Sequence, residues 1–385
     1  MYFLKIIIKN SFRHKLRTFL TIAGICIAIL AFGLLRTVVN AWYAGVEGSS
    51  ATRLVTRNAI SLIFFLPISY KEKIRQIPGV KNVSYAYWFG GVYVSEKNFI
   101  PNFAVDAQTV FDMFPEFFLP EDQKNAFIID RKACVAGRKI AEKYGWKIGD
   151  NITLKGTIFP GKWDFVLRGI YKGAQKSTDE TQFMFHWEYL NEYLKKTAPH
   201  RADQVGWYTV TVKHPGLASE VAAAIDDKFK NSLAETKTET EKAFQLGFVA
   251  MTEAIVIAVR IVSFIVIIII MAVMANTMAM TARERIGEYA VMKTLGFGWV
   301  YIAGLIFGES LVISLMGCGL GIALTYPAAK AFGNAMSTYL PIFNVQIQTI
   351  YMDVAVAFLV AVIAALFPAW RAVNIRIADG LRSIG

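Results

Sequence analysis

Side chains that could carry out chemistry are sparse in this sequence and follow no catalytic spacing. The four histidines lack metal-ligand spacing, and among the three cysteines only Cys134 lies outside the apolar runs, so no disulfide framework is expected. A phosphate-binding G-x-x-x-x-G-K-[ST] loop and a G-x-S-x-G nucleophile elbow are both missing. The acid pairs Asp179/Glu180 and Asp226/Asp227 have the polar, charge-mixed surroundings of a solvated surface. We therefore expect no catalytic residue, metal or cofactor in this chain.

A dense group of charged side chains lies instead in residues 281–299, TARERIGEYAVMKTLGFGW, between two long apolar runs. At 100° per residue this segment predicts a short helix with two apolar sides. One side consists of Ile286, Tyr289 and Ala290, and the roughly opposite side of Val291 and Leu295. Such a helix is best explained by burial between the membrane face and a second protein. The alternative is an amphipathic helix that lies on the lipid surface without a partner.

Two acids of this segment, Glu284 and Glu288, are four residues apart beside the second apolar side. If a partner docks there, these acids should face a basic surface of the partner. We therefore expect both acids and Leu295 to matter for complex formation, whereas membrane insertion should not depend on them. Gly296 should end the helix and turn the chain toward the next apolar run.

The composition indicates a membrane protein. The 385 residues are 55% hydrophobic and only 18% charged, and the mean hydropathy is +0.41. Four largely uncharged runs are long enough to span a hydrocarbon core of about 30 Å, and the fourth is the shortest. A polar region of about 200 residues, the size of an independent domain, lies between the first two runs.

Lysines and arginines close to the spans predict the orientation. They precede the first span, follow the second and follow the fourth, whereas the loop between the third and fourth spans carries only Lys330. The positive-inside rule then places both termini and residues 283–298 in the cytoplasm and the large polar domain outside. The net charge of +12 is not gathered into a basic stripe, so nucleic-acid binding is not expected.

The large polar domain should have an α+β fold, since short helical and alternating segments follow one another along it. Residues 231–242 turn polar without proline or glycine, and we expect a helix that continues through them straight into the second span. The two spans that flank the domain would then act as stalks.

Three charged residues fall at or inside the spans. Arg36 and Arg260 should lie at the outer membrane interface, where a long side chain reaches headgroups or water. Glu309 should lie about 15 Å into the third span and face protein. We expect it to be a helix-packing group that is protonated or hydrogen-bonded to serine, threonine or backbone of a neighbouring span. The alternative is a proton or substrate relay.

Several motifs resemble those of the MacB/FtsX-type ABC transporter permeases. Residues 284–296 (ERIGEYAVMKTLG) are similar to that family's E-R-x-R-E-I-G-x-x-[KR]-A-L-G segment, and residues 14–25 (HKLRTFLTIAGI) to its entry into the first span. Glu309, Gly317 and Gly321 match its third span, and residues 368–372 (PAWRA) and 379–382 (DGLR) match its tail. Residues 77–80 (IPGV) and 149–154 (GDNITL) resemble its periplasmic core domain. The departures are Gly287 and Ala290, where the family usually has Arg and Gly, and residues 376–377 (RI) in place of Asp-Pro.

The resemblance implies a helical four-span transmembrane domain with a large α+β extracytoplasmic domain inserted between spans 1 and 2. The expected segments are a cytoplasmic N-terminal segment (1–17), span 1 (18–39), the MacB-like core domain (40–242), a stalk with span 2 (243–282), a cytoplasmic coupling helix (283–298), span 3 (299–326), an outer loop (327–349), span 4 (350–367) and a cytoplasmic tail (368–385). It implies transmembrane packing by Glu309, Gly317 and Gly321. It implies ATPase coupling by Glu284, Arg285, Glu288, Val291, Met292, Lys293, Leu295 and Gly296.

The implied function is that of a non-catalytic permease in a bacterial inner membrane. Two separate ATPase subunits would bind ATP and Mg²⁺, and their motion would pass through the coupling helices to the outer domains. A second permease copy or a homologous permease, membrane lipids and a periplasmic adaptor or substrate-binding protein are the further expected partners. The implied work is efflux, or extraction of a lipid, lipoprotein, peptide or amphiphile. The alternative is an FtsX-like regulator that activates a cell-wall hydrolase, but the large outer domain favours transport.

Overall fold

The computed structural model describes residues 2–96, 98, 100–175, 177–336, 340 and 342–375. The chain forms two compact units. The first unit is drawn from residues 1–40, 253–335 and 343–385, and the second from residues 41–252 and 336–342. The tail motif at 379–382 and the departure at 376–377 lie outside the described residues.

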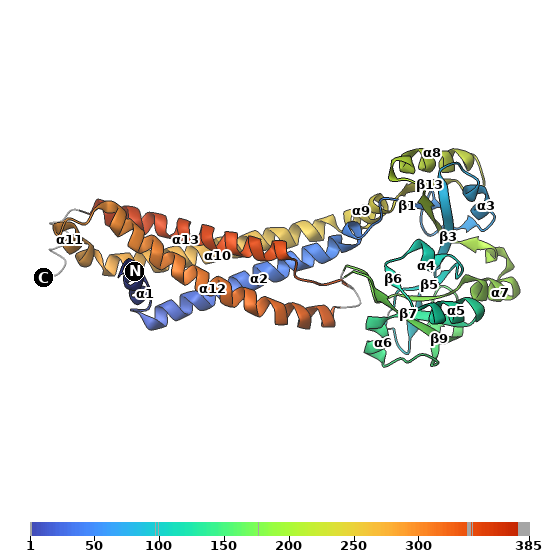
Figure 1. Cartoon of the computed structure of the whole chain (residues 1–385), viewed down its shortest axis with the longest axis horizontal. Coiled ribbons are helices and arrows are strands. Elements are labelled where there is room, and N and C mark those ends of the chain that lie inside the picture. The colour runs from blue at the N-terminus through green and yellow to red at the C-terminus, as the bar shows by residue number, and fades with distance from the viewer. Residues whose placement is uncertain are drawn as a thin grey trace. The chain divides into compact units, whose positions relative to one another are not determined.

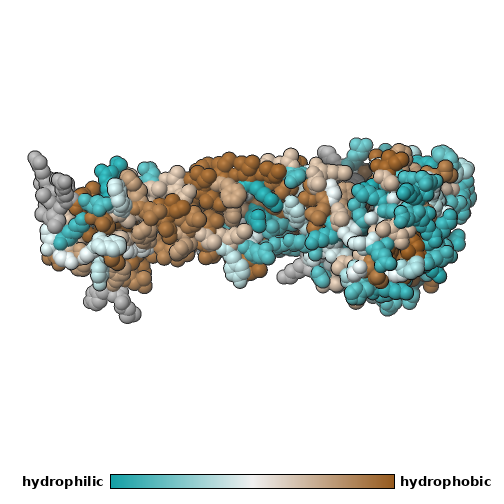
Figure 2. Space-filling model, turned by 90° about the horizontal axis from the view of Figure 1, so that it is seen from above, coloured by the Kyte–Doolittle hydropathy of each residue, from teal (hydrophilic) through white to brown (hydrophobic). Residues whose placement is uncertain are grey.

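The first unit is a bundle of helices. Four of the helices in the described chain are long and apolar enough to cross a membrane: α2 (Lys15–Glu47), α10 (Glu253–Glu284), α12 (Trp299–Ala335) and α13 (Ile347–Asn374). Two shorter helices, α1 (Tyr2–Ser11) and α11 (Ile286–Thr294), lie at the end of the bundle where α12 begins and α13 ends (Figure 1). Hydrophobic side chains cover much of the outward surface of the long helices, as expected for contact with lipid (Figure 2).

Small residues hold the bundle together. A Cβ atom added to Gly317 would come within 2.7 Å of Ile25 on α2, and one added to Gly321 within 2.8 Å of Ile29, so α12 and α2 approach closely at this pair. On another side of α12, the Ser310 and Ser314 hydroxyls donate 2.7 Å hydrogen bonds to backbone carbonyls of α13. These contacts give α12 two fixed neighbours without requiring a hydrophobic driving force inside the bilayer.

The second unit is an α+β domain built on one mixed sheet. Within the described residues this sheet has eleven strands in the order β13-β1-β12-β3-β5-β10-β7-β9-β8-β4, with β6 paired to β9. Neighbours are antiparallel except for β10 with β5 and β7 with β9. The strands are β1 (Arg53–Asn58), β3 (Val80–Trp88), β4 (Gly91–Tyr93), β5 (Asn102–Val105), β6 (Phe117–Phe118), β7 (Ala133–Gly137), β8 (Asn151–Gly156), β9 (Gly161–Gly173), β10 (Phe183–His186), β12 (Trp207–Val212) and β13 (Thr236–Thr240). The short strands β2 (Leu66–Pro67) and β11 (Gln204–Val205) pair separately.

Helices pack on both faces of this sheet, with a large aromatic core on one face and a smaller core on the other. The sequence alternates apolar and polar residues along β3 and β12, so Tyr85, Tyr208 and Val210 point into the core, where Ile74 and Ile225 meet them. The helices of the unit are α3 (Tyr70–Arg75), α4 (Val110–Met113), α5 (Glu121–Ile129), α6 (Arg138–Tyr144), α7 (Trp187–Thr197), α8 (Ala218–Lys228) and α9 (Glu241–Met251), with short 3₁₀ turns at Pro199–Arg201 and Pro215–Leu217.

The expected helix through residues 231–242 is wrong. Thr236–Thr240 form strand β13, which pairs with β1 at the edge of the sheet. The TKTET sequence alternates β-branched threonines with charged residues, and Thr238 is buried while its hydroxyl donates to Asp226, 2.8 Å away. The helix begins only at Glu241, where the Thr240 hydroxyl accepts a hydrogen bond from the Ala243 amide, and a break at Thr252 separates α9 from α10.

Candidate docking site around helix α11

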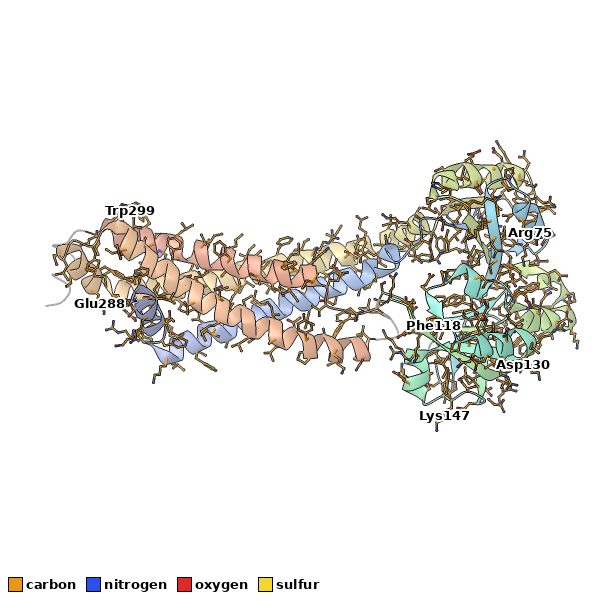
Figure 3. The ribbon with its side chains drawn as sticks, in the orientation of Figure 1. Arg75, Phe118, Asp130, Lys147, Glu288 and Trp299 are labelled. Atoms are coloured by element: carbon orange, nitrogen blue, oxygen red, sulfur yellow. The ribbon has the colours of Figure 1, made fainter. Side chains whose placement is uncertain are left out.

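The charged segment forms a short helix held between two long ones. Helix α10 ends at Glu284, Arg285 occupies the break, and α11 runs over Ile286–Thr294. Gly296 then adopts φ +86°, a left-handed conformation that favours glycine, and α12 begins at Trp299. Glu288 and Trp299 accordingly lie at the same end of the bundle (Figure 3).

The inner side of α11 is tied into the bundle. Arg285 is buried at the break and its guanidinium pairs with the Glu309 carboxylate of α12 and, at 2.9 Å, with Glu288. The same guanidinium lies 5.3 Å from the centre of the Tyr289 ring, which is buried beside Ala290. A buried charge that loses such partners is costly, so this cluster fixes how α11 sits on the bundle.

Glu309 faces protein, with 2% of its surface exposed, but its partner differs from the expected serine, threonine or backbone group. The partner is the charged Arg285 side chain, 24 residues earlier. The break between α10 and α11 directs this arginine inward, which the sequence pattern alone does not reveal. Arg285 is therefore buried within the protein. If it contributes to coupling, it does so through its contacts with Glu309 and Glu288.

The two acids that were expected to face a partner are also satisfied within the chain. Arg17 makes a two-pronged contact with Glu284, at 2.7 and 2.8 Å, and Arg13 pairs with Glu288. Partial burial alone would raise the pKa of the Glu288 carboxyl, but hydrogen bonds from Arg13 and Arg285 outweigh it and hold that pKa below its ordinary value. The start of α2 and the residues before it supply cations to these acids, and their expected role in partner binding stays a prediction.

Lys293 ties the far end of α11 to α13. Its ammonium group donates to the backbone carbonyls of Val373 and Ile375, where α13 ends. The neighbouring Met292 is partly buried against the bundle. Lys293 and Met292, which were both proposed from the sequence as coupling residues, therefore contact other helices of this chain.

The outer side of the segment is exposed and apolar. Leu295 is 72% exposed, and Val291, one turn earlier, is also exposed. The exposed apolar surface continues past the glycine turn with Phe297, Trp299 and Val300. A surface of this kind next to a rigidly held helix is suited to binding a protein groove or an interfacial lipid layer.

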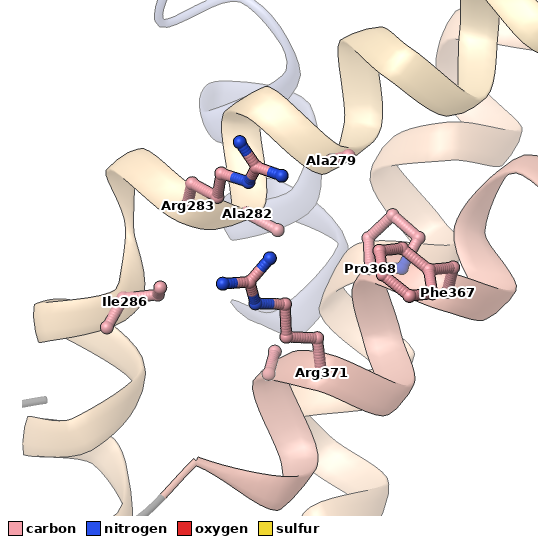
Figure 4. A pocket seen from close by; sticks show the side chains of 8 residues that line it. Ala279, Ala282, Arg283, Ile286, Phe367, Pro368 and Arg371 are labelled. Atoms are coloured by element: carbon pink, nitrogen blue, oxygen red, sulfur yellow. The ribbon is translucent and has the colours of Figure 1, made fainter. Parts of the chain in front are cut away.

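A shallow pocket beside the same segment carries two arginines. It is lined by Ala279, Ala282, Arg283, Ile286, Phe367, Pro368, Arg371 and Ala372, from α10, α11 and α13. The guanidinium groups of Arg283 and Arg371 both reach over it (Figure 4). Neither makes an ion pair within the described parts of the chain, so both are available to an anionic group.

Asp353 is a buried acid that the sequence pattern did not single out. It lies on α13 with 1% of its surface exposed, and neither carboxyl oxygen has a hydrogen-bond partner among the described residues. Its Oδ2 atom comes within 3.4 Å of a Cβ added to Gly33 on α2, beside the Thr325 side chain of α12. An acid inside a run otherwise free of charge was the available signal. The other charged residues proposed near the outer interface, Arg36 and Arg260, lie on α2 and α10.

Within the described residues, no group of three or more histidine, cysteine or acidic side chains could hold a metal ion. The ion pairs at α11 link it to neighbouring helices, and its opposite side is exposed and apolar.

Comparisons with known proteins cover nearly the whole chain. The family model of the MacB-like periplasmic core domain matches residues 18–228, and that of the FtsX-like permease C-terminal domain matches residues 260–377. An uncharacterized ABC transporter permease of Methanocaldococcus jannaschii is 24% identical over 397 residues, covering 97% of this chain and 96% of that protein. Another, from Mycobacterium tuberculosis, is 22% identical over 198 residues, covering 51% of this chain and 22% of that protein.

Two solved structures resemble part of the fold. The periplasmic region of MacB from Actinobacillus actinomycetemcomitans aligns with a TM-score of 0.39 and 9% identity, covering 53% of this chain and 95% of that one. The extracellular domain of the transporter YknZ from Gram-positive bacteria aligns with a TM-score of 0.36 and 12% identity, covering 49% of this chain and 100% of that one.

Proposed function

Because the chain belongs to the FtsX-like ABC transporter permeases that carry a MacB-like periplasmic core domain, we propose that it converts ATP-driven motion of separate ATPase subunits into motion of its outer domain. Membership of an ABC permease family implies an ATPase partner. In this proposal ATP and Mg²⁺ are bound by that partner, and the permease itself is not catalytic.

The observation that carries the proposal is the contrast between the two sides of α11. The exposed side, Val291 and Leu295, offers an apolar anchor to the ATPase. The other side is linked through Arg285 to α12, through Glu288 to Arg13, and through Lys293 to α13. A displacement of α11 would therefore be passed to several helices at once, as a coupling element requires.

The same contacts support an orientation with both termini in the cytoplasm. Arg13 and Arg17 near the N-terminus, Lys293 in α11 and the end of α13 meet at one end of the bundle. An excess of Lys and Arg marks the cytoplasmic side. Arg283 and Arg371 would then contact anionic headgroups of the inner leaflet of the cell membrane. The second unit would lie outside.

The work done by the outer domain is proposed to be efflux, or extraction of a lipid, lipoprotein, peptide or amphiphile, by a complex of two permeases and two ATPase subunits, with an adaptor or binding protein as a further partner. An FtsX-like complex would instead activate a cell-wall hydrolase without moving a substrate. The two differ in whether a labelled amphiphile leaves the membrane when ATP is supplied.

Amide hydrogen exchange on the assembled complex in nanodiscs tests the mechanical step. We expect ATP, with an ATPase variant that binds but cannot hydrolyse it, to change exchange in α11, at the end of α2 and in α9. A matched ATPase variant that cannot bind ATP should leave exchange unchanged. Changes that stop at α11 and do not reach the second unit would contradict transmission to the outer domain.

A further inference from the structure

The face of the sheet that packs against α4 and α5 is only partly covered, and its remainder lines a cleft. Side chains at every second position of β3 and β12 point away from the helix-covered core, and they include Trp88 and Trp207. Phe103 on β5 lies between them, with ring centres 5.1 Å from Trp88 and 6.0 Å from Trp207. All three rings are only partly buried. Sheets normally cover an apolar face with another layer, and the described residues cover this row of aromatic rings only in part.

This face forms the wall of an open cleft of about 1370 Å³. Pockets that hold drug-sized ligands measure roughly 300–1,000 Å³, so the cleft can take a larger molecule. Its other walls come from Gly45 and Gly48 at the end of α2, from Phe244 and Phe248 of α9, and from the loop that carries Ile63. Ile63 is 79% exposed, so the apolar surface continues onto the rim.

Each acid that lines the cleft has an ion-pair or hydrogen-bond partner. Arg53 pairs with Glu116 at 2.6 Å and with Glu241 at 2.8 Å. Asp112 pairs with Lys124 at 2.8 Å, and Asp179 accepts hydrogen bonds from the amide and hydroxyl of Thr181. Arg53 offsets only one of its two carboxylates and Asp179 has neutral donors, so some negative charge remains in the lining.

The remaining cations of the lining have no such partner. Lys81 and Lys213 are exposed at the bulged end of the β3–β12 ladder and make no ion pair among the described residues. Arg201 contacts the rings of Phe65 and Phe159 and the Ile158 carbonyl, and it too lacks an acid within that part of the chain. The cleft thus combines an aromatic wall with three cations that have no ion-pair partner among the described residues.

The backbone of this wall favours an alkyl chain over a peptide. The strands β1, β12, β3 and β5 each have a hydrogen-bonded neighbour on both sides, so their backbone groups are used within the sheet. A peptide that binds by strand addition needs an unpaired edge. An alkyl chain needs only apolar side chains, and the unpaired lysines and arginine match an anionic headgroup.

We propose that this cleft binds an anionic amphiphile, with its alkyl chain along Trp88, Phe103 and Trp207 and its headgroup at Lys81 and Lys213. The inference rests on the proposed function in one respect, because it names the class of molecule on which the outer domain acts. Binding itself requires neither ATP nor the ATPase.

Photo-crosslinking on the full chain in zwitterionic nanodiscs tests the inference without the ATPase. The probes are a diazirine-bearing C16 fatty acid and the uncharged alcohol of the same chain length, and mass spectrometry maps the labelled peptides. We expect the acid to label peptides of β3, β5 and β12. The double change Lys81→Glu with Lys213→Glu should reduce this labelling about tenfold and leave labelling by the alcohol unchanged.

Two further variants complete the test. Ala86→Trp, which fills the middle of the wall, should abolish labelling of the cleft by both probes, whereas Lys155→Glu, outside the cleft, should change nothing. Circular dichroism and the melting temperature report whether each variant folds. If Ala86→Trp does not fold, the double change Lys81→Glu with Lys213→Glu still tests the proposal. Equal labelling by acid and alcohol, labels confined to the spans, or a cleft protected by a second copy of the chain would overturn the proposal. None of these results would bear on ATPase docking.

Discussion

The two sides of α11 differ in whether their side chains have partners within the chain. On the inner side, Arg285, Glu288 and Tyr289 find their partners within the chain, so their interactions belong to the fold. On the outer side, Val291 and Leu295 remain exposed. The difference shows that residue type is a poor guide here: the charged groups, which look suited to recognition, pair within the chain, and the apolar groups are the more exposed ones.

The largest loss of folding free energy should follow from breaking the buried ion pair between Arg285 and Glu309 on the inner side of α11. Glu309→Ala leaves the Arg285 guanidinium without its main partner in a buried site, and we expect a loss of about 3–5 kcal/mol of folding free energy. The readout is the melting temperature of the purified permease together with its yield as a monodisperse species.

Two variants show whether the pair is the cause. The double change Arg285→Met with Glu309→Leu removes both charges and should recover most of the stability. Asp353→Asn changes a buried acid that has no partner among the described residues, so it should cost no more than about 1 kcal/mol. An undiminished melting temperature in Glu309→Ala would show that the inner side does not hold α11.

A smaller effect is expected where the same contrast recurs on α12. Gly317 faces α2, where an added Cβ would meet Ile25 at 2.7 Å, whereas Gly319 has nothing within 4 Å. Gly317→Ala should destabilise the bundle by about 1–3 kcal/mol. Gly319→Ala should be neutral or stabilise the helix by up to about 1 kcal/mol. Equal melting temperatures for the two variants would contradict the close packing of α12 on α2.

The smallest effect concerns the exposed ion pair between Arg13 and Glu288. Both side chains are substantially exposed, so Arg13→Ala should cost less than about 1 kcal/mol. Because the pKa of Glu288 is lowered in the folded protein, its contribution is present at neutral pH and is lost as the pH falls through that lowered value.

Melting temperatures measured between neutral pH and pH 3 should therefore converge for the wild type and Arg13→Ala at the acid end. Lys155→Glu, on strand β8, serves as a surface-charge control with no part in this network. A difference in melting temperature between the wild type and Arg13→Ala that grows toward low pH would contradict the assignment of Glu288 as the partner of Arg13.

The sequence predicted the α+β outer domain and four apolar spans, because both follow from runs and alternations of neighbouring residues. The described helices extend past the predicted ends, since charged residues such as Glu47 and Arg283 continue a helix beyond the lipid. Residues 231–242 were misassigned because a polar run without glycine or proline fits both a helix and an edge strand. Pairing with β1 decided the outcome.

The docking site was only half predictable. Helical periodicity separates Tyr289 from Leu295 without any structure. The partners of Glu309 and Glu284 could not be predicted, because Arg285 and Arg17 reach them through the turn of the chain and the packing of separate helices. Asp353 was passed over, although an acid in an otherwise uncharged run was a signal in the sequence.

Co-purification with the ATPase tests the central claim most directly. The permease would be co-expressed with its ABC ATPase subunit, in the wild-type form and with the double change Val291→Ala and Leu295→Ala. Truncating exposed apolar anchors commonly costs about 1–3 kcal/mol of binding free energy, about a tenfold to hundredfold loss of affinity. We expect this loss with an unchanged melting temperature, while Leu320→Ala, which truncates an exposed leucine on α12, should retain the ATPase. An undiminished ATPase stoichiometry in the double variant would contradict the assignment of α11 as the coupling helix.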